Sequence, residues 1–357
     1  MKTEKSGKDF RTGGTVMDYQ DVLVNARKTI LNCKACQECN GLACGNTLPG
    51  PGSKAPGNGA HDNWKAWKAI KLNFDTFVPD CPVDTRSTLF GRECSLPILT
   101  GPIGSMLQYS QEDVTVAFND AMIQTASETG IIDCFGDGVA RETLPGALRS
   151  VSRYPGCAIP VLNPMPNEQI KERIALFEDS ASLAVSVVVD SAGLSHWKHK
   201  GDQPGSKTVE DLRELKSCTC KSFIVKGIMT AKGALQAVEA GADGIIVSNH
   251  GGRALPDVPA TAEVLPEIVR AVKGQTTIIV DGGIRHGSDI VKALALGADG
   301  VLICRPFAVA WFGGKVEGIR IYIEKLAAEF TSAMYMVGAR KISDLNPDMV
   351  RIGPSGR

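Results

Sequence analysis

Eight short apolar segments recur along this chain of 357 residues, and stretches with a helical pattern separate them. Apolar segments that alternate with helices are typical of a parallel sheet whose faces are covered by helices. The segments span 96–99, 130–135, 157–162, 183–189, 222–226, 244–248, 276–280 and 300–304. Eight such units are what a closed barrel requires, so the sequence predicts an α/β fold, a (β/α)8 TIM barrel. A doubly wound open sheet is the alternative, because periodicity does not reveal whether a sheet closes.

Two of these segments are preceded by the same turn. The strings "AVEAGADGIIV" (237–247) and "ALALGADGVLI" (293–303) each combine a helix end, a Gly-Ala-Asp-Gly turn and an apolar strand. Glycine is favoured where a helix stops and a tight connection to a strand begins. We therefore expect one kind of helix-to-strand connection, used twice.

The chain outside the barrel has a different pattern. A helix is expected over about 18–31, before a group of cysteines and the stretch 45–59, where eight of fifteen residues are Gly or Pro. Such a stretch cannot form helix or strand. Residues 313–338 have the pattern of a long amphipathic helix that would close the outer layer of the barrel. We divide the chain into an N-terminal helical, Cys-rich extension over 1–60 and a barrel over 61–357.

Charge and hydropathy exclude some partners. Lys plus Arg and Asp plus Glu number 39 each, so no net field favours nucleic acid or an anionic membrane. The first fifteen residues lack an apolar signal-peptide core, and no apolar run reaches the roughly 18 residues of a membrane span. We expect a cytoplasmic protein with small-molecule ligands, no nucleic-acid or membrane partner, and a homo-oligomeric assembly.

Charged and polar residues gather at the ends of the last five predicted strands. Catalytic residues of (β/α)8 barrels lie at the C-terminal ends of the strands, and phosphate is often held after strands 7 and 8. The residues that the pattern brings to this rim are Asp190, Lys226, His250, Arg253, Asp281, Arg285 and Arg305.

A phosphate site is expected after strands 7 and 8. In "DGGIRHG" (281–287), Asp281 begins a turn whose glycines let backbone N–H groups approach a ligand, and Arg285 follows. Arg305 after strand 8 adds a second guanidinium, which suits phosphate. The sequence therefore predicts a phosphorylated ligand, and turn glycines with surface arginines are the alternative.

Three further side chains suggest acid–base chemistry. Lys226 ends an apolar strand, so it needs either a carboxylate such as Asp190 or Asp281, or an electron-rich ligand. Alone, His250 could be a hydrogen-bonded loop histidine and Arg253 a solvated charge. Together on one Gly-rich loop, they indicate a general base beside a carboxylate-binding guanidinium.

Longer strings carry a resemblance to a known family. "VKGIMT" (225–230), "IIVSNHGGRALPDVPAT" (245–261), "VDGGIRHGSDIVKALALGADGV" (280–301) and "CRP" (304–306) closely resemble the FMN-dependent α-hydroxy acid oxidases and dehydrogenases. This family includes glycolate oxidase, lactate oxidase and flavocytochrome-type lactate dehydrogenases. The resemblance is dense over about 222–306 and fainter over about 59–190.

The resemblance implies FMN as cofactor and a role for each rim residue. His250 would take a proton from the substrate, Arg253 would hold its carboxylate, and Asp190 would pair with the imidazolium. The residues expected to contact FMN are Pro102 to Gly104 and Ser248 beside the ring, Lys226 near N1 and O2, and Gly283, Arg285 and Arg305 at the phosphate. We expect oxidation of a 2-hydroxy acid to a 2-oxo acid, with oxygen or another carrier as electron acceptor.

The sequence departs from the family around the substrate. Two tyrosines expected in 53–64 and in "PVLNPM" (160–165) are missing, as is a second carboxylate-binding Arg in 191–200, where only Trp197, Lys198 or a His could substitute. The connection from Asp190 to Lys226 is also short, so the N-terminal cysteine region is a candidate to cover the pocket. We expect a preference for apolar or aromatic 2-hydroxy acids. Redox-neutral isomerisation on FMN, or a flavin- or metal-binding sensor, are the alternatives.

The cysteine group has metal-ligand spacing. Cys33, Cys36, Cys39 and Cys44 form a C-x2-C-x2-C-x4-C array, which could bind zinc or an iron–sulfur cluster. Members of the resembled family ordinarily lack it, and Gly45 stands where a ferredoxin has Pro. Free thiols or redox-active pairs are the alternatives.

Overall fold

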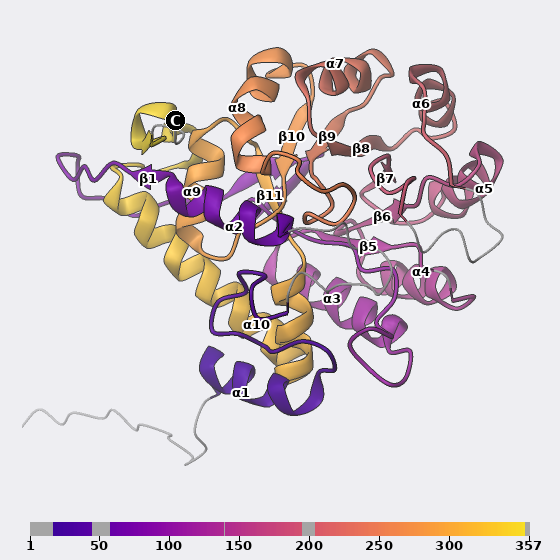
Figure 1. Ribbon diagram of the computed structural model, residues 1–357, viewed down its shortest axis with the longest axis horizontal. Helices are drawn as coiled ribbons and strands as arrows, with labels where there is room; N and C mark the ends of the chain where they lie inside the picture. Colours follow the sequence, from indigo (N-terminus) through magenta and orange to yellow (C-terminus); the bar gives the residue numbers. More distant parts are fainter. Residues whose placement is uncertain (1–16, 45–57, 139, 195–203, 354–357) are drawn as a thin grey trace, which may run out of the picture.

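A closed barrel of eight parallel strands forms the centre of the computed structural model, which describes residues 17–44, 58–138, 140–194 and 204–353 (Figure 1). Around the barrel, the strands follow the order β4-β11-β10-β9-β8-β7-β6-β5. Their bounds are β4 (Ile98–Thr100), β5 (Asp133–Gly136), β6 (Ala158–Leu162), β7 (Ala184–Val188), β8 (Ser222–Ile228), β9 (Gly244–Val247), β10 (Thr277–Val280) and β11 (Gly300–Ile303).

The barrel closes between β4 and β5. The backbone N–H of Thr100 donates to the carbonyl of Ile132 (2.9 Å), and Leu99 forms a parallel bridge with Ile132. All eight predicted strands are present, and this closure rules out the open sheet.

Helices surround the barrel, and each strand is followed by one. They are α3 (Thr115–Thr129), α4 (Thr143–Arg153), α5 (Asn167–Glu178), α6 (Val209–Lys216), α7 (Ala231–Glu239), α8 (Thr261–Val272), α9 (Gly287–Ala295) and α10 (Arg305–Met336). One apolar core lies between these helices and the strands, and a second fills the barrel interior. Within the described ranges, no helix combines the length and apolarity that a membrane crossing requires.

A hairpin closes the N-terminal end of the barrel. Strands β2 (Ser87–Leu89) and β3 (Arg92–Cys94) pair antiparallel, and Leu89 and Cys94 pack with Leu99, Ile279 and Leu302 of the interior core. The opposite, C-terminal end is therefore the one that remains available for ligands.

The N-terminal extension lies against the last helix. Helix α1 (Tyr19–Thr29) matches the predicted helix and packs on α10 (Figure 1). Tyr19 stacks on Tyr322 of α10, with 5.2 Å between the ring centroids. Helix α10 begins earlier than predicted, at Arg305, and its helical geometry breaks at Gly314 and Lys315. The predicted Gly/Pro-rich loop falls almost entirely on 45–57, outside the described residues.

The remaining elements join the two ends of the chain. Helix α2 (Gly59–Ala69) leads to β1 (Lys71–Leu72), which pairs antiparallel with β12 (Val350–Arg351). The short helices η2 (Ile342–Asp344) and η3 (Pro347–Met349) precede β12.

The repeated turn is confirmed and has a physical basis. Gly241 after α7 and Gly297 after α9 have φ of +89° and +102°, which favours glycine. The aspartate two residues later then binds the start of a neighbouring strand, because Asp243 accepts from the N–H of Phe223 and Asp299 from that of Ile278, both at 2.8 Å. Each turn thus stops a helix and anchors a strand.

These two glycines give a matched stability test. A Cβ at Gly297 would lie 2.6 Å from Cγ1 of Val269, whereas one at Gly241 would come no closer than 3.6 Å to Lys216. Gly297→Ala combines backbone strain with overpacking and should lower the free energy of unfolding by about 2–4 kcal/mol, against about 1 kcal/mol for Gly241→Ala. Equal losses in urea denaturation would contradict this explanation.

Candidate active site

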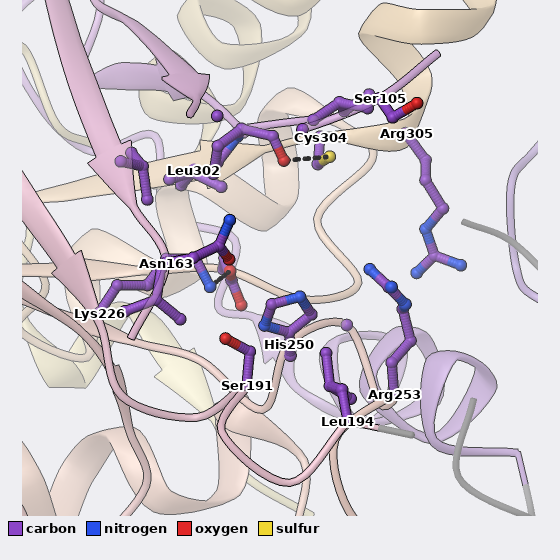
Figure 2. Close-up of a pocket in the computed structure, with 18 of the residues that line it drawn as sticks. Ser105, Asn163, Ser191, Leu194, Lys226, His250, Arg253, Leu302, Cys304 and Arg305 are labelled. Atoms are coloured by element: carbon purple, nitrogen blue, oxygen red, sulfur yellow. Dashed lines mark hydrogen bonds and ion pairs between the residues drawn. The ribbon is translucent and has the colours of Figure 1, made fainter. Parts of the chain in front are cut away.

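A cavity of about 380 Å³ opens at the C-terminal end of the barrel, a volume in the usual range for small-molecule sites (Figure 2). The structure brings nearly all the predicted site residues to it. Those that line it are Pro102, Gly104, Lys226, His250, Arg253, Asp281, Gly283, Arg285 and Arg305. Asp190 and Ser248 bind lining residues directly, as the hydrogen bonds below show.

His250 is held in the cavity by Asp190. Nδ1 of His250 lies 2.7 Å from Oδ1 of Asp190, which follows β7, and β8 separates that strand from β9. Burial lowers the pKa of His250 below its usual value of 6.5, and the attraction of Asp190 only partly offsets this effect. The imidazole is therefore neutral at physiological pH and able to accept a proton.

The loop that carries His250 is left-handed and pressed against α2. His250, Gly251 and Gly252 have φ of +58°, +67° and +76°. A Cβ at Gly252 would lie 2.2 Å from the backbone of Gly59, so only glycine fits there. The Gly-Gly pair of the sequence thus serves a tight turn and a close backbone contact.

An amide pair fixes the same loop. Nδ2 of Asn63 donates to Oδ1 of Asn249 (2.8 Å), and Nδ2 of Asn249 donates back to Oδ1 of Asn63 (3.0 Å). The N–H of Thr261 also donates to Asn63 (3.1 Å), and both asparagines are buried. Helix α2 is therefore part of the scaffold of the site.

Lys226 is buried between two carboxylates. Its Nζ donates to Oγ of Ser248 (2.7 Å) and lies 3.3 Å from Asp281 and 3.7 Å from Asp190. Burial alone would lower the pKa of Lys226, but Asp281 and Asp190 raise it above the usual value, so the ammonium stays charged. The ion-pair alternative is thus correct and compatible with a ligand role, since Lys226 also lines the cavity.

Arg253 and Arg305 point toward one another across the opening of the cavity (Figure 2). Arg253 lines the cavity and is not a solvated surface charge. Nη1 of Arg305 is buried and has no hydrogen-bond partner among the described residues. A buried guanidinium with an unused donor fits an anionic ligand that is not part of the chain.

Arg285 is the predicted phosphate residue whose contacts differ most from expectation. Its Nε donates to the carbonyl of Cys39 (2.6 Å) and its Nη1 to the carbonyl of Ile284 (2.6 Å). The guanidinium thus joins the cysteine segment to the rim. The sequence could not show this contact, because the two residues are far apart in the chain.

The residues present fit FMN. Arg305 offers an unused buried donor for a phosphate, and Gly283, with φ of +85°, packs on the backbone of Asn63 without a side chain. Lys226 provides a buried cation at the floor of the cavity, and Gly136 leaves the backbone of Gly104 in close contact.

Sequence reasoning missed a polar group after β6. Asn163 lines the cavity (Figure 2). Its amide donates to Asp137, which also pairs with Arg173. Burial raises the pKa of Asp137 to about 6, although Arg173 lowers it. The stretch "PVLNPM" had been read only for a missing tyrosine, and nothing in its pattern indicated an asparagine that faces a ligand.

A buried tyrosine near the guanidiniums was also missed. The hydroxyl of Tyr109 has no hydrogen-bond partner within the described part of the chain. Burial raises its pKa well above 10, although Arg305 and Arg253 act in the opposite direction. Trp197, Lys198 and the neighbouring histidines, which the sequence offered as a second carboxylate site, lie outside the described residues.

The four N-terminal cysteines line a second, smaller cavity of about 50 Å³ next to Arg285. As placed, they form no metal site, because no group of three or more His, Cys, Asp or Glu side chains in the described residues is arranged to hold an ion. Burial raises the pKa of Cys33 to about 11. For Cys39, Arg285 and Arg305 outweigh burial and lower the pKa.

The chain is similar to several known proteins. The family model described as FMN-dependent dehydrogenase matches residues 160–352. The chain is 34% identical to a 2-hydroxyacid oxidase of Dictyostelium discoideum over 81% of each protein. It is 31% identical to 2-hydroxyacid oxidase 2 of Bos taurus over 81% of this chain and 89% of the relative.

A solved structure of a mandelate oxidase variant with 2-hydroxy-phenylacetamide superimposes with a TM-score of 0.74 and 25% identity, over 94% of this chain and 98% of that one. The family match spans the strands that carry His250, Arg253 and both phosphate-site arginines. This chain therefore belongs to the FMN-dependent dehydrogenase family.

Proposed function

We propose that this protein oxidises a 2-hydroxy acid to the corresponding 2-oxo acid with FMN as the first electron acceptor. The observation that carries the proposal is the imidazole of His250, bound to Asp190 at 2.7 Å and lining the cavity beside Arg253. The relatives from Dictyostelium discoideum and Bos taurus are 2-hydroxyacid oxidases, which supports the same reaction class.

The proposed roles follow from the contacts of each side chain. With Nδ1 engaged by Asp190, Nε2 of His250 is left to take the proton that the substrate loses, and Asp190 stabilises the imidazolium that results. Arg253 would hold the substrate carboxylate through two parallel N–H donors. FMN, when bound, supplies the acceptor for the two electrons that leave the substrate.

The cofactor end of the cavity has its own residues. Arg305 and Arg285, with the backbone at Gly283, would hold the phosphate, and Lys226 would stay charged near the ring. Pro102 and Gly104 would pack against the ring from β4, and Ser248 would lie close to it. Asp281 supports this end indirectly, because it accepts from Ser248 at 2.7 Å.

The lining favours apolar substrates. Ile103, Leu107 and Leu194 contribute apolar surface to the cavity, and Asn163 lines it from the stretch 160–165, in which the family's tyrosine was expected. We propose 2-hydroxy acids with apolar or aromatic side chains as substrates. Oxygen or another carrier as the final acceptor, the cytoplasmic location and the homo-oligomeric assembly stay predictions.

His250→Ala tests the proposed base. The variant should keep FMN but reduce its flavin about 10²–10⁴-fold more slowly, which is the usual contribution of a positioned general base. The rate is measured by stopped-flow absorbance after anaerobic mixing with substrate. His61→Ala, a histidine outside the cavity, is the matched control. Wild-type reduction rates in the His250 variant would show that another group takes the proton.

The pH profile gives a second test. Because the pKa of His250 is lowered, the neutral base should persist down to about pH 6.5, and flavin reduction should fall only below that value. Asp190 raises the pKa of His250, so Asp190→Asn should move the midpoint to still lower pH and also lower the plateau rate. A midpoint above 6.5 in the wild type, or an upward shift in the variant, would be inconsistent with this assignment.

Arg253→Lys tests the carboxylate site. A lysine cannot form two parallel hydrogen bonds to a carboxylate, so kcat/KM should fall. The loss of transition-state stabilisation should be about 2–4 kcal/mol, and the FMN content should be unchanged. Arg305→Lys should instead weaken FMN binding. Glycolate, lactate, 2-hydroxyisocaproate and mandelate are compared in each protein. Glycolate as the best substrate would disprove the apolar pocket, and an unchanged Arg253→Lys enzyme would place the carboxylate elsewhere.

A further inference from the structure

The segment that carries the four cysteines lies next to the proposed FMN site. It lies between α1 and α2 in the chain, and it crosses α10 in Figure 1, where Val309 and Tyr322 of that helix line a cavity together with the cysteines. Cys33, Cys36, Cys39 and Cys44 all line one cavity of about 50 Å³, and Arg285 lines both this cavity and the larger one. A shared side chain therefore connects the cysteines to the proposed phosphate site.

The segment is bonded to the barrel on several sides. The N–H of Leu31 donates to the carbonyl of Tyr109 (2.8 Å), and the amide of Asn32 donates to that of Gln108 (2.9 Å). Glu38 accepts from the indole of Trp64 (2.7 Å). The four thiols are therefore held near one another by the fold, which lowers the entropic cost of gathering them around a ligand.

The backbone around the first cysteines is strained. Asn32 and Ala35 have φ of +58° and +40°, in the left-handed region that residues with a Cβ avoid. Ala35 is buried, and Nε of Arg27 donates to its carbonyl (3.1 Å), which holds the turn in place. Strain of this kind persists where the surroundings enforce it, and it clusters at ligand sites.

Two donors already face the sulfur atoms. The N–H of Ala35 points to Sγ of Cys33 (3.4 Å), and Nη2 of Arg285 lies 3.8 Å from Sγ of Cys39. N–H donors to sulfur are a feature of thiolate metal sites, where they tune the ligands. Lys34 and Lys325 line the same cavity and can offset the negative charge of a centre with four thiolates.

We propose that Cys33, Cys36, Cys39 and Cys44 bind one metal centre through their thiolates, and that this centre holds the segment against the FMN site. The thiols do not converge as placed, but a cysteine needs only rotation about its single side-chain torsion to redirect its sulfur. Four thiolates suit either one zinc ion or one iron–sulfur cluster. Both centres share the same thiolate chemistry.

The shared arginine couples this centre to FMN. Arg285 donates to the carbonyl of Cys39, so loss of the metal frees the segment and changes the position of a guanidinium at the phosphate site. This second part of the inference rests on FMN binding at the larger cavity. Metal removal should therefore raise the Kd for FMN by about 5–150-fold, a usual range for coupled sites.

The test begins with metal content. Protein purified without oxygen should contain either about one zinc, or about four iron with a matching amount of acid-labile sulfide and absorbance near 400 nm, per chain. Cys36→Ser and Cys39→Ser should lose most of this metal. Cys81→Ser and Cys220→Ser, which replace exposed cysteines elsewhere, are matched controls and should keep it.

Two measurements use the wild-type protein, so they test the proposal even if a variant fails to fold. Alkylation of the native protein, read by mass spectrometry, should spare the four cysteines until a chelator or oxidant removes the metal. Fluorescence titration then gives the Kd of FMN before and after removal. Wild-type protein without stoichiometric metal, or metal retained by the Cys36→Ser/Cys39→Ser double variant, would overturn the metal site. Unchanged FMN affinity after metal removal would overturn the coupling. Neither readout requires turnover, so both are independent of the proposed oxidation.

Discussion

The buried ammonium of Lys226 is the charge on which the site depends. Two carboxylates with little exposure, Asp190 and Asp281, lie within 3.7 Å of it, and neither would remain ionised at low cost in the barrel interior without a cation. Asp190 then has a charge with which to orient His250, and Asp281 accepts from Ser248. Removing Lys226 would leave both carboxylates uncompensated. One side chain at the end of β8 therefore stabilises the residues at the ends of β7, β9 and β10.

The loops at the C-terminal rim of the barrel are held in place by close contacts of their backbone with helix α2. Gly252 contacts Gly59 of α2, Gly283 contacts Asn63, and Trp67 donates to the carbonyl of Gly282 at 2.7 Å. Side chains on these glycines would push α2 away from the barrel. Helix α2, which precedes the barrel in sequence, is thus as necessary to the position of His250 as β9 itself. The predicted boundary at residue 60 between extension and barrel falls inside this helix.

The strands and most rim residues were predictable because the information is local. An apolar run followed by Lys226, or by His250 and Arg253, places those side chains at one end of a parallel sheet, whatever the rest of the chain does. The contact of Arg285 with Cys39 was not predictable, because it depends on the path of a segment with no periodicity. Asn163 and Asp137 were missed for a related reason. Asn163 and Asp137 come from different strand ends, and only the fold brings them together and places Arg173 beside the aspartate.

The charges around the cavity bear on how the protein distinguishes the cofactor phosphate from the substrate carboxylate. Among the described residues, Arg253, Arg305, Arg285 and Lys226 contribute four positive charges, and Asp190 and Asp281 contribute two negative ones. Asp137 also lines the cavity but is paired with Arg173, so the balance is two positive charges. A phosphate of charge near −2 on the bound cofactor would offset that balance. No general excess of positive charge from the described side chains would then remain to attract a substrate carboxylate. Recognition of the carboxylate must therefore come from the directed donors of Arg253, which is a property of geometry and not of net charge.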